Sequence, residues 1–195
     1  MHTVPSRLGV MDAIEQRTSV RSYTQDKLGR NTIQALLDAA VRAPTAVHQE
    51  AWSFVIVQDA ALLRRLSDRA KGLFLEEVQR HRPARGEHLL ETFKQPDFNI
   101  FYDAGTLIVI CGPTDGLFVA ADCWLAAANL MLAARGIGLG TCVIGSAVAG
   151  LNTPELKAEL GIPPEVSAVA PIIVGRPREE TQPTRRKSPH VLAWR

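Results

Sequence analysis

The chain has 195 residues, of which 46% are hydrophobic and 22% are charged, and its formal net charge at pH 7 is +2. A chain of this length buries roughly 70% of its unfolded surface on folding, so it can form a core without disulfides or a structural metal. The small net charge, and sparse aromatic residues that no basic stripe accompanies, argue against a nucleic-acid-binding protein.

The first third of the chain predicts two helices and a strand. Apolar spacing predicts a short helix around 10–14, and a second helix that Asn31 or Thr32 caps and Pro44 ends. The segment SFVIV, 53–57, is rich in β-branched residues and predicts a buried strand.

The middle of the chain repeats this alternation with longer elements. Helical spacing extends over 60–78, and TLIVI, 106–110, predicts a second buried strand. Between them, 80–103 is charged and weakly periodic, so it predicts a mobile segment with one helix. Residues 117–135 form a helical pattern that is apolar on almost every side.

The last third begins with an extended segment within 136–145. Thr153 is expected to cap a further helix, with Pro154 in its first turn and Gly161 at its end. VSAVAPIIVG, 166–175, predicts a fourth strand.

Strands that alternate with helices, without an internal repeat or a linker, predict one domain over residues 1–195 of either the α/β or the α+β class. Its polar, proline-rich end, about 176–195, is expected to form an arm. The apolar helix at 117–135 must be covered on all sides. It could therefore occupy the centre of a monomer's core or the seam of a dimer.

The three cysteines, Cys111, Cys123 and Cys142, have no CxxC spacing. An odd count without this spacing indicates neither a disulfide framework nor a zinc site, and it fits a reducing, cytoplasmic compartment. No other His/Cys pattern has metal-ligand spacing, so the sequence predicts no metal centre.

No targeting or membrane-spanning segment is predicted. The first residues lack an apolar core of signal-peptide length. The most apolar stretch, 117–136, is interrupted by Asp122, Asn129 and Arg135. It therefore predicts a buried helix rather than a membrane span.

Two basic clusters could form an anion site. In RTSVRSY, 17–23, Arg17 and Arg21 flank Thr18 and Ser19, and guanidinium groups match phosphate oxygens bidentately. The alternative is a solvated helix end, where arginines favour the helix dipole. The second cluster, RRK at 185–187, can join the first only if the arm folds back, and otherwise it is a solvated tail.

Two loops could bind a ligand. APTAVHQEAW, 43–52, is a polar helix-to-strand junction, either a ligand loop or a plain connection, and its His48 is either a catalytic candidate or a surface histidine. GIGLGTCVIG, 136–145, follows a helix, so it is not a dinucleotide fingerprint. It predicts a helix end at Gly136 and then a backbone of close approach.

A flat ring could lie against the backbone around Ile144 and Gly145. Cys142 is expected to be inert, because no cation adjoins it in sequence. The sequence shows no hydrolase motif. Any chemistry is therefore expected to belong to a bound cofactor that the protein orients and tunes.

These segments, in this order, resemble the FMN-dependent nitroreductase family. RTSVRSY is similar to its N-terminal R-x-S-x-R/K-x-F/Y loop, APTAVHQEAW to its A-P-S-x-x-N-x-Q-P-W loop, GIGLGTCVIG to its flavin-facing segment, and the terminal RRK to its phosphate cluster. The resemblance spans about 11–189. It implies a three-layer α+β fold, in which helices flank a mixed sheet, and an intertwined homodimer with two FMN sites at the seam.

The resemblance also implies an NADH- or NADPH-dependent flavoenzyme that reduces nitroaromatics, quinones or similar acceptors by a ping-pong mechanism. The flavin would carry the chemistry, and 80–103 would roof the pocket. Two alternatives stay open. One is a non-catalytic dimeric module whose basic clusters bind FMN, another phosphate ligand or an acidic partner protein, and the other is a structural dimer without a ligand.

By the same resemblance, Arg17 and Ser19 would hold the FMN phosphate together with Arg186 or Lys187, and Arg21 would lie near the N1–C2 carbonyl edge of the ring. The partner subunit would supply the 44–48 loop, and main-chain N–H groups near 144–145 would face N5 and O4. The implied cofactor-binding residues are Arg17, Thr18, Ser19, Arg21, Pro44, Thr45, Ala46, His48, Val143, Ile144, Gly145, Arg186 and Lys187.

Three positions depart from the family pattern. His48 stands where asparagine is usual, Glu50 where glutamine is usual, and Ala51 where proline is usual. These changes concern ring-edge contacts and substrate choice more than FMN binding. One hypothesis is that His48 donates a hydrogen bond to an electron-rich acceptor.

Overall fold

The computed structural model describes residues 8–81 and 87–195. Its centre is a four-stranded sheet in the order β1-β2-β4-β3, and all three ladders are antiparallel. Among the described residues, the only parallel pairing is an isolated bridge between Ser19 and Thr141. The sheet was expected to mix parallel and antiparallel strands, and this bridge is its only parallel part. The strands are β1 (Ser53–Val57), β2 (Leu107–Pro113), β3 (Gly140–Val143) and β4 (Val166–Gly175).

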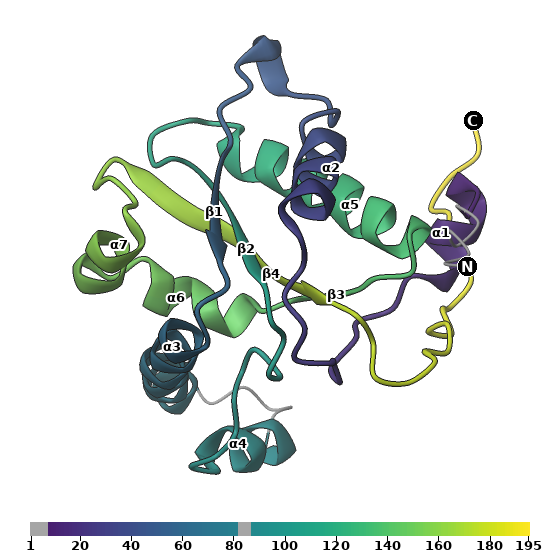
Figure 1. Cartoon of the computed structure of the whole chain (residues 1–195). Helices are drawn as coiled ribbons and strands as arrows, with labels where there is room; N and C mark the ends of the chain where they lie inside the picture. The colour runs from purple at the N-terminus through teal and green to yellow at the C-terminus, as the bar shows by residue number, and fades with distance from the viewer. Residues whose placement is uncertain (1–7, 82–86) are drawn as a thin grey trace.

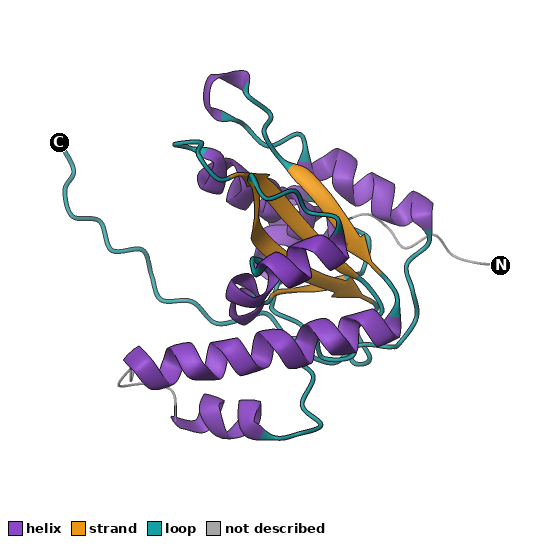
Figure 2. Ribbon diagram, turned by 90° about the vertical axis from the view of Figure 1, so that its left-hand side faces the viewer, coloured by secondary structure: helices purple, strands orange, loops and turns teal. Residues whose placement is uncertain are grey.

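Helices cover both faces of the sheet, which confirms the α+β class and the three layers (Figures 1 and 2). Short 3-10 turns at Ala46–His48 and Gly145–Ala147 complete the elements. The helices are α1 (Val10–Gln16), α2 (Arg30–Ala40), α3 (Ala60–His81), α4 (Glu87–Lys94), α5 (Val119–Gly136), α6 (Val148–Leu151) and α7 (Pro154–Leu160).

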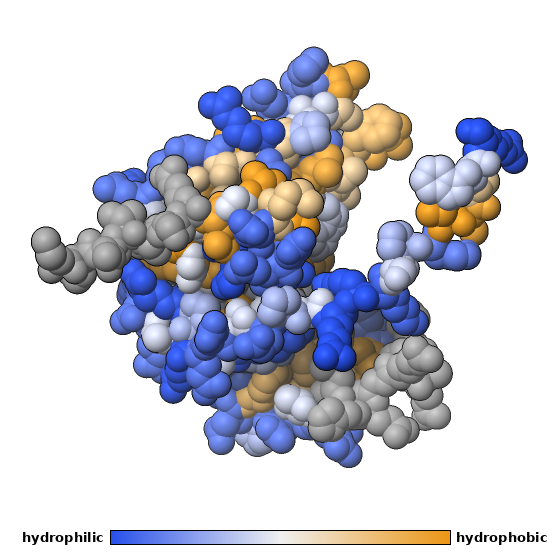
Figure 3. All heavy atoms as spheres, turned by 90° about the vertical axis from the view of Figure 1, so that its right-hand side faces the viewer, coloured by the Kyte–Doolittle hydropathy of each residue, from blue (hydrophilic) through white to orange (hydrophobic). Residues whose placement is uncertain are grey.

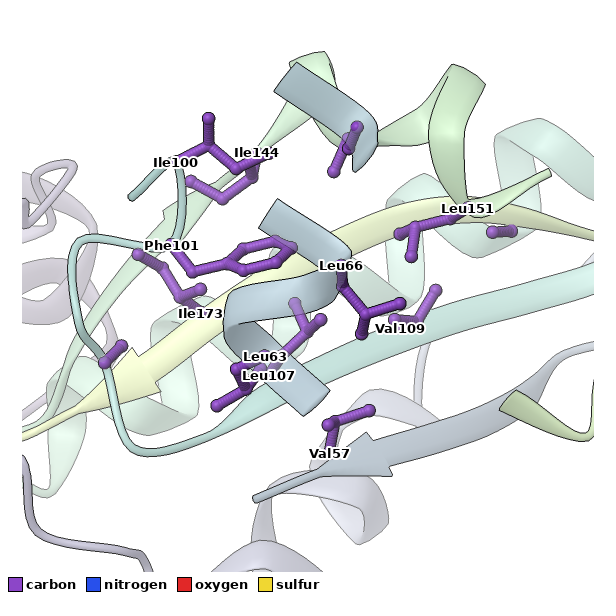
Figure 4. Close-up of a cluster of buried hydrophobic side chains, with 14 of the residues drawn as sticks. Val57, Leu63, Leu66, Ile100, Phe101, Leu107, Val109, Ile144, Leu151 and Ile173 are labelled. Carbon is purple, nitrogen blue, oxygen red and sulfur yellow. The ribbon is translucent and has the colours of Figure 1, made fainter. Parts of the chain in front are cut away.

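Alternation along the strands divides the core in two. From β2, Leu107 and Val109 join a cluster with α3, while Ile108 and Ile110 join a cluster with α2 and α5. Figure 4 shows part of the first cluster, in which Phe101 lies among side chains from the sheet and α3. Successive residues of a strand point to opposite faces, so one run of apolar residues fills both cores.

Local signals predicted α7 correctly at both ends. The hydroxyl of Thr153 accepts a hydrogen bond from the Leu156 N–H at 3.4 Å, Pro154 begins the helix, and Gly161 follows it in a left-handed conformation with φ 69°. The predicted cap of α2 was wrong. Its N-cap is Gly29, without a side-chain cap, so Asn31 lies inside the first turn.

The strand prediction for 53–57 was correct, but the expected burial was not. Ser53 is exposed and Ile56 is 37% exposed. The reason is position, because β1 is an edge strand with β2 on one side only. A run of β-branched residues is compatible with either a central or an edge strand.

The segment 80–103 begins with the last two residues of α3 and contains the predicted helix, α4, while 82–86 of that prediction lie outside the described residues. Aromatic rings join α4 and the turn after it to α3. Phe93 lies 4.9 Å from Phe74 and 5.3 Å from Phe98 between ring centroids, and Phe98 meets Tyr102 edge-on at 5.6 Å.

Helix α5 is only partly covered by its own chain. Its inner face is buried, but Trp124 and Leu125 are 42% and 44% exposed. Just before the helix, Leu117 and Phe118 are 88% and 50% exposed. Burial within a monomer therefore does not account for the apolar character of the whole helix. In the described part of the chain, no helix is both long enough and apolar enough to cross a membrane.

Candidate functional site

The first basic motif lies against β3. The Val20 N–H donates to the Thr141 carbonyl at 3.0 Å, beside the bridge between Ser19 and Thr141. The buried Tyr23 hydroxyl donates to the Val20 carbonyl at 2.8 Å and holds the segment in a turn. RTSVRSY and GIGLGTCVIG, which lie far apart in sequence, therefore form one surface.

The C-terminal arm, residues 176–195, folds back along the same motif. The Thr24 N–H donates to the Arg176 carbonyl at 3.0 Å, and the guanidinium of Arg178 donates to the Tyr23 carbonyl at 3.3 and 3.2 Å. Farther along, the hydroxyls of Thr18 and Thr184 share a hydrogen bond of 2.8 Å.

These contacts meet the condition set for a joint anion site. Thr184 directly precedes the second basic cluster, and both Arg186 and Lys187 are exposed there. Arg17, Thr18 and Ser19 are half-buried. The arm thus brings Thr184, the residue before the second basic cluster, into contact with Thr18 of the first.

A third arginine joins this region. Arg135, in the last turn of α5, lines the same small hollow as Arg17, Thr18 and Thr181. Its Nη2 donates to Gln16 Oε1 at 2.8 Å, whereas its buried Nε has no hydrogen-bond partner among residues 8–81 and 87–195. An unsatisfied buried cationic donor beside Arg17 fits an anionic ligand.

Sequence reasoning missed the position of Arg135 beside Arg17 because it treated the residue as an interruption of an apolar helix. The position of Arg135 directly before GIGLG was the available signal.

The main chain after β3 is open at one residue. The Ile144 N–H donates to the Pro171 carbonyl at 2.9 Å and its side chain is buried, so this N–H does not face a ligand as was expected. Gly145 is exposed, its N–H forms no hydrogen bond within the described ranges, and no atom would lie within 4 Å of an added Cβ. Val143 is half-buried at the end of β3.

Cys142 lies within this site but is not activated. Burial raises the pKa of its thiol, while Arg21, a hydrogen bond with Ser19, and Arg17 act in the opposite direction. The prediction of an inert thiol agrees with this balance, although its premise was incomplete, because cations adjoin Cys142 in space. Burial likewise raises the pKa of Cys111 to about 12 and that of Cys123 to about 11.

A cavity of about 250 Å³ adjoins Arg21, on the side of the 97–103 turn. Arg178 lines it together with Asp97, Asn99 and the aromatic pair described above. This part of 80–103 thus lies beside Arg21, and its role as a roof over a cofactor stays a prediction. The turn is strained, because Tyr102 and Asp103 have φ values of 51° and 53°.

The 43–52 loop does not join these residues within one chain. It projects at the top of the view in Figure 1, away from β3. Pro44 and His48 are exposed, and Thr45 and Ala46 are half-buried. Val47, His48 and Glu50 have φ values of 48°, 54° and 46°, which is unusual above all for a β-branched valine. Such strain is found at functional sites more often than elsewhere.

Gly140 is the close-approach position predicted for the glycine-rich segment. A Cβ added there would lie 2.6 Å from Val20 Cγ2 and 3.0 Å from Pro177 Cγ. Gly140→Ala is expected to push the basic motif away from β3 and to lower the free energy of unfolding by about 1–3 kcal/mol, as overpacking does. Denaturant titration measures this loss. Gly145→Ala, where an added Cβ meets nothing within 4 Å, is the control, and equal losses in both variants would contradict the expectation.

Comparison with known proteins shows which proteins this chain is similar to. The nitroreductase family model matches residues 14–176. A Thermus thermophilus protein named NADH dehydrogenase is 26% identical over 210 residues, which cover 96% of this chain and 97% of that protein. A Bacillus subtilis protein named FMN reductase (NAD(P)H) is 26% identical over 183 residues, which cover 88% of this chain and 67% of that protein.

Among solved structures, a nitroreductase with bound FMN from Bacteroides fragilis has a TM-score of 0.79 at 25% identity, with coverage of 96% of this chain and 98% of that chain. The family model spans most of the chain and includes RTSVRSY, the strained loop and the glycine-rich segment. This chain therefore belongs to the nitroreductase family.

Proposed function

We propose that the protein is an FMN-dependent oxidoreductase that takes electrons from NADH or NADPH. The observation that carries the proposal is the return of the arm to RTSVRSY, with Thr184 bonded to Thr18 beside the basic residues. The relatives named as an NADH dehydrogenase and an FMN reductase, and the FMN-bound nitroreductase of similar fold, support this assignment.

Different residues of this chain would bind the phosphate and the ring of FMN. Arg17, Ser19 and the Arg186–Lys187 pair would hold the phosphate, with Arg135 supporting the same charge from α5. Arg21, beside the cavity, would place a cation at the ring. The open N–H of Gly145 would donate to a ring acceptor. When bound, FMN supplies a ring that accepts a hydride from the nicotinamide and passes it to an acceptor.

We further propose a homodimer in which the partner completes each site. Exposed apolar residues lie on α1 and α5, and a groove of about 330 Å³ lies between α1, α2 and α5. Figure 3 shows apolar side chains on this side of the molecule. Contiguous exposed apolar residues often mark a surface that another protein chain covers. The 44–48 loop, which does not reach the basic residues of its own chain, would then serve the site across the seam.

The electron donor and the acceptor would use one pocket in turn, which is the ping-pong order. Nitroaromatics and quinones are the acceptor class that we propose. His48, exposed at the end of the loop, would donate to the acceptor. If so, His48→Ala lowers turnover with some acceptors, whereas unchanged turnover with every acceptor would remove that role. The three buried free cysteines fit a reducing, cytoplasmic compartment.

The test is spectroscopic. The purified protein should be yellow or take up added FMN, and NADH or NADPH should bleach the flavin absorbance, which a nitroaromatic or a quinone then restores. A protein that binds FMN without bleaching would support the non-catalytic module instead. A colourless protein that ignores FMN would overturn the proposed function.

A further inference from the structure

The buried carboxylate of α5, Asp122, is only 4% exposed. It lies on the inner side of the helix. Its neighbours there, Val119, Cys123 and Ala126, all belong to the apolar cluster that α2 and α5 form with the sheet. Burial of a charged group costs free energy unless it is paired or hydrogen-bonded. Among the described residues, no lysine or arginine forms an ion pair with Asp122.

The hydrogen bond of Asp122 goes to the strained loop. The Ala46 N–H donates to both carboxylate oxygens, at 3.2 and 3.3 Å. Within residues 8–81 and 87–195, no other side-chain hydrogen bond joins the 43–52 loop to the rest of the protein. The residues that follow, Val47 and His48, have positive φ, so the contact lies directly before the strained part.

We propose that Asp122 is a positioning residue, which holds the 43–52 loop in the conformation that the cofactor site needs. A left-handed valine costs of order 1–3 kcal/mol and persists only where the surroundings enforce it. A charge-assisted hydrogen bond is strong enough to fix the first residue of the turn. The inference rests on the proposed function, because the loop matters to FMN only if it serves the site of the partner subunit.

Two variants remove the two ends of this hydrogen bond. Asp122→Ala removes the acceptor. Ala46→Pro removes the donor N–H and is compatible with the backbone, because Ala46 begins the 3-10 turn and Thr45 before it is extended, with ψ 149°, as the residue before a proline must be. Each variant is expected to weaken FMN binding about tenfold, the equivalent of one charge-assisted hydrogen bond. The double variant should lose no more than about twofold beyond either single variant, because both act on one contact.

Two controls separate positioning from general support of the fold. Asn129, also on α5, donates from Nδ2 to the Ala39 carbonyl of α2 at 3.3 Å. Asn129→Ala removes a comparable bond to a helix rather than to the loop, so FMN affinity should not change. Asp122→Asn keeps an acceptor oxygen and should recover most of the lost affinity.

Amide hydrogen exchange of the cofactor-free dimer gives a readout that does not depend on FMN. Exchange at residues 46–50 should accelerate about tenfold in Asp122→Ala and not in Asn129→Ala. Unchanged exchange in Asp122→Ala would overturn the positioning role even if FMN binds. Faster exchange without any FMN binding in the unmodified protein would instead count against the proposed function. Additive losses in the double variant would also overturn the inference.

Discussion

FMN at about a thousand times its dissociation constant is expected to raise the free energy of unfolding by about 4 kcal/mol. The gain follows from linkage, because a ligand that binds only the folded protein shifts the folding equilibrium towards it. For a chain of this size, 1 kcal/mol moves the melting temperature by roughly 2–4 °C, so we expect a rise of about 8–16 °C. Thermal melts with and without FMN, at one fixed protein concentration, measure the shift.

A matched pair of variants assigns this stabilisation to the basic site. Arg17→Ala should remove about 1.5–3 kcal/mol of the gain, the value of a hydrogen bond to a charged group. Arg69→Ala changes an exposed arginine of α3, on the other face of the sheet, and should keep the full gain. A melting temperature indifferent to FMN, or equal responses in the two variants, would contradict the account.

Phe101→Ala is expected to lower the free energy of unfolding by about 3–5 kcal/mol, the largest loss that we expect from a single substitution. Phe101 is 0% exposed and lies among Leu66, Leu107 and Ile173 (Figure 4). Removal of the ring would leave a cavity between α3 and the sheet. Its main chain is also fixed, because the Phe101 N–H donates to Asn99 Oδ1 at 2.9 Å. The residues around Phe101 can therefore move only partly into such a cavity.

Denaturant titration with an unchanged slope would isolate the stability effect. Phe101→Leu keeps most of the apolar volume and should lose clearly less than the alanine variant. A loss below about 1 kcal/mol for Phe101→Ala would mean that this cluster is not the principal core beside α3.

Elements with strong local signals could be predicted from sequence. The strand 166–175 was located with its correct bounds because apolar residues, several of them β-branched, make up most of it. The helix at 154–160 was located because Thr153, Pro154 and Gly161 are each typical of their positions. Such signals act over a few residues and do not depend on the rest of the fold.

Features without a local sequence signal were predicted less well. The turn at 145–147 and α6 after it were not predicted, because GSAVAGL has no distinct period. No local rule could place Val47 at positive φ, where glycine or asparagine is expected. The role of Asp122 was hidden because its partner Ala46 is 76 residues away.

The same difference between local signals and long-range contacts applies to the candidate site. The residue types of the anion site could be listed from the sequence, since arginine and hydroxyl side chains suit phosphate. Their convergence depends on contacts such as Thr18 with Thr184, 166 residues apart. Arg135 was missed because its helix is otherwise apolar, and only the fold places it beside Arg17.

The central claim is that both ends of the chain bind one phosphate, and a comparison of FMN with riboflavin tests it most directly. Riboflavin has the same ring but lacks the phosphate. Calorimetric titration should show that FMN binds at least about a hundredfold more tightly than riboflavin, the contribution of two charge-assisted hydrogen bonds. In the Arg17→Ala/Arg186→Ala double variant, most of this difference should disappear. Equal affinity for the two flavins, or a preference for FMN that survives the double variant, would contradict the account.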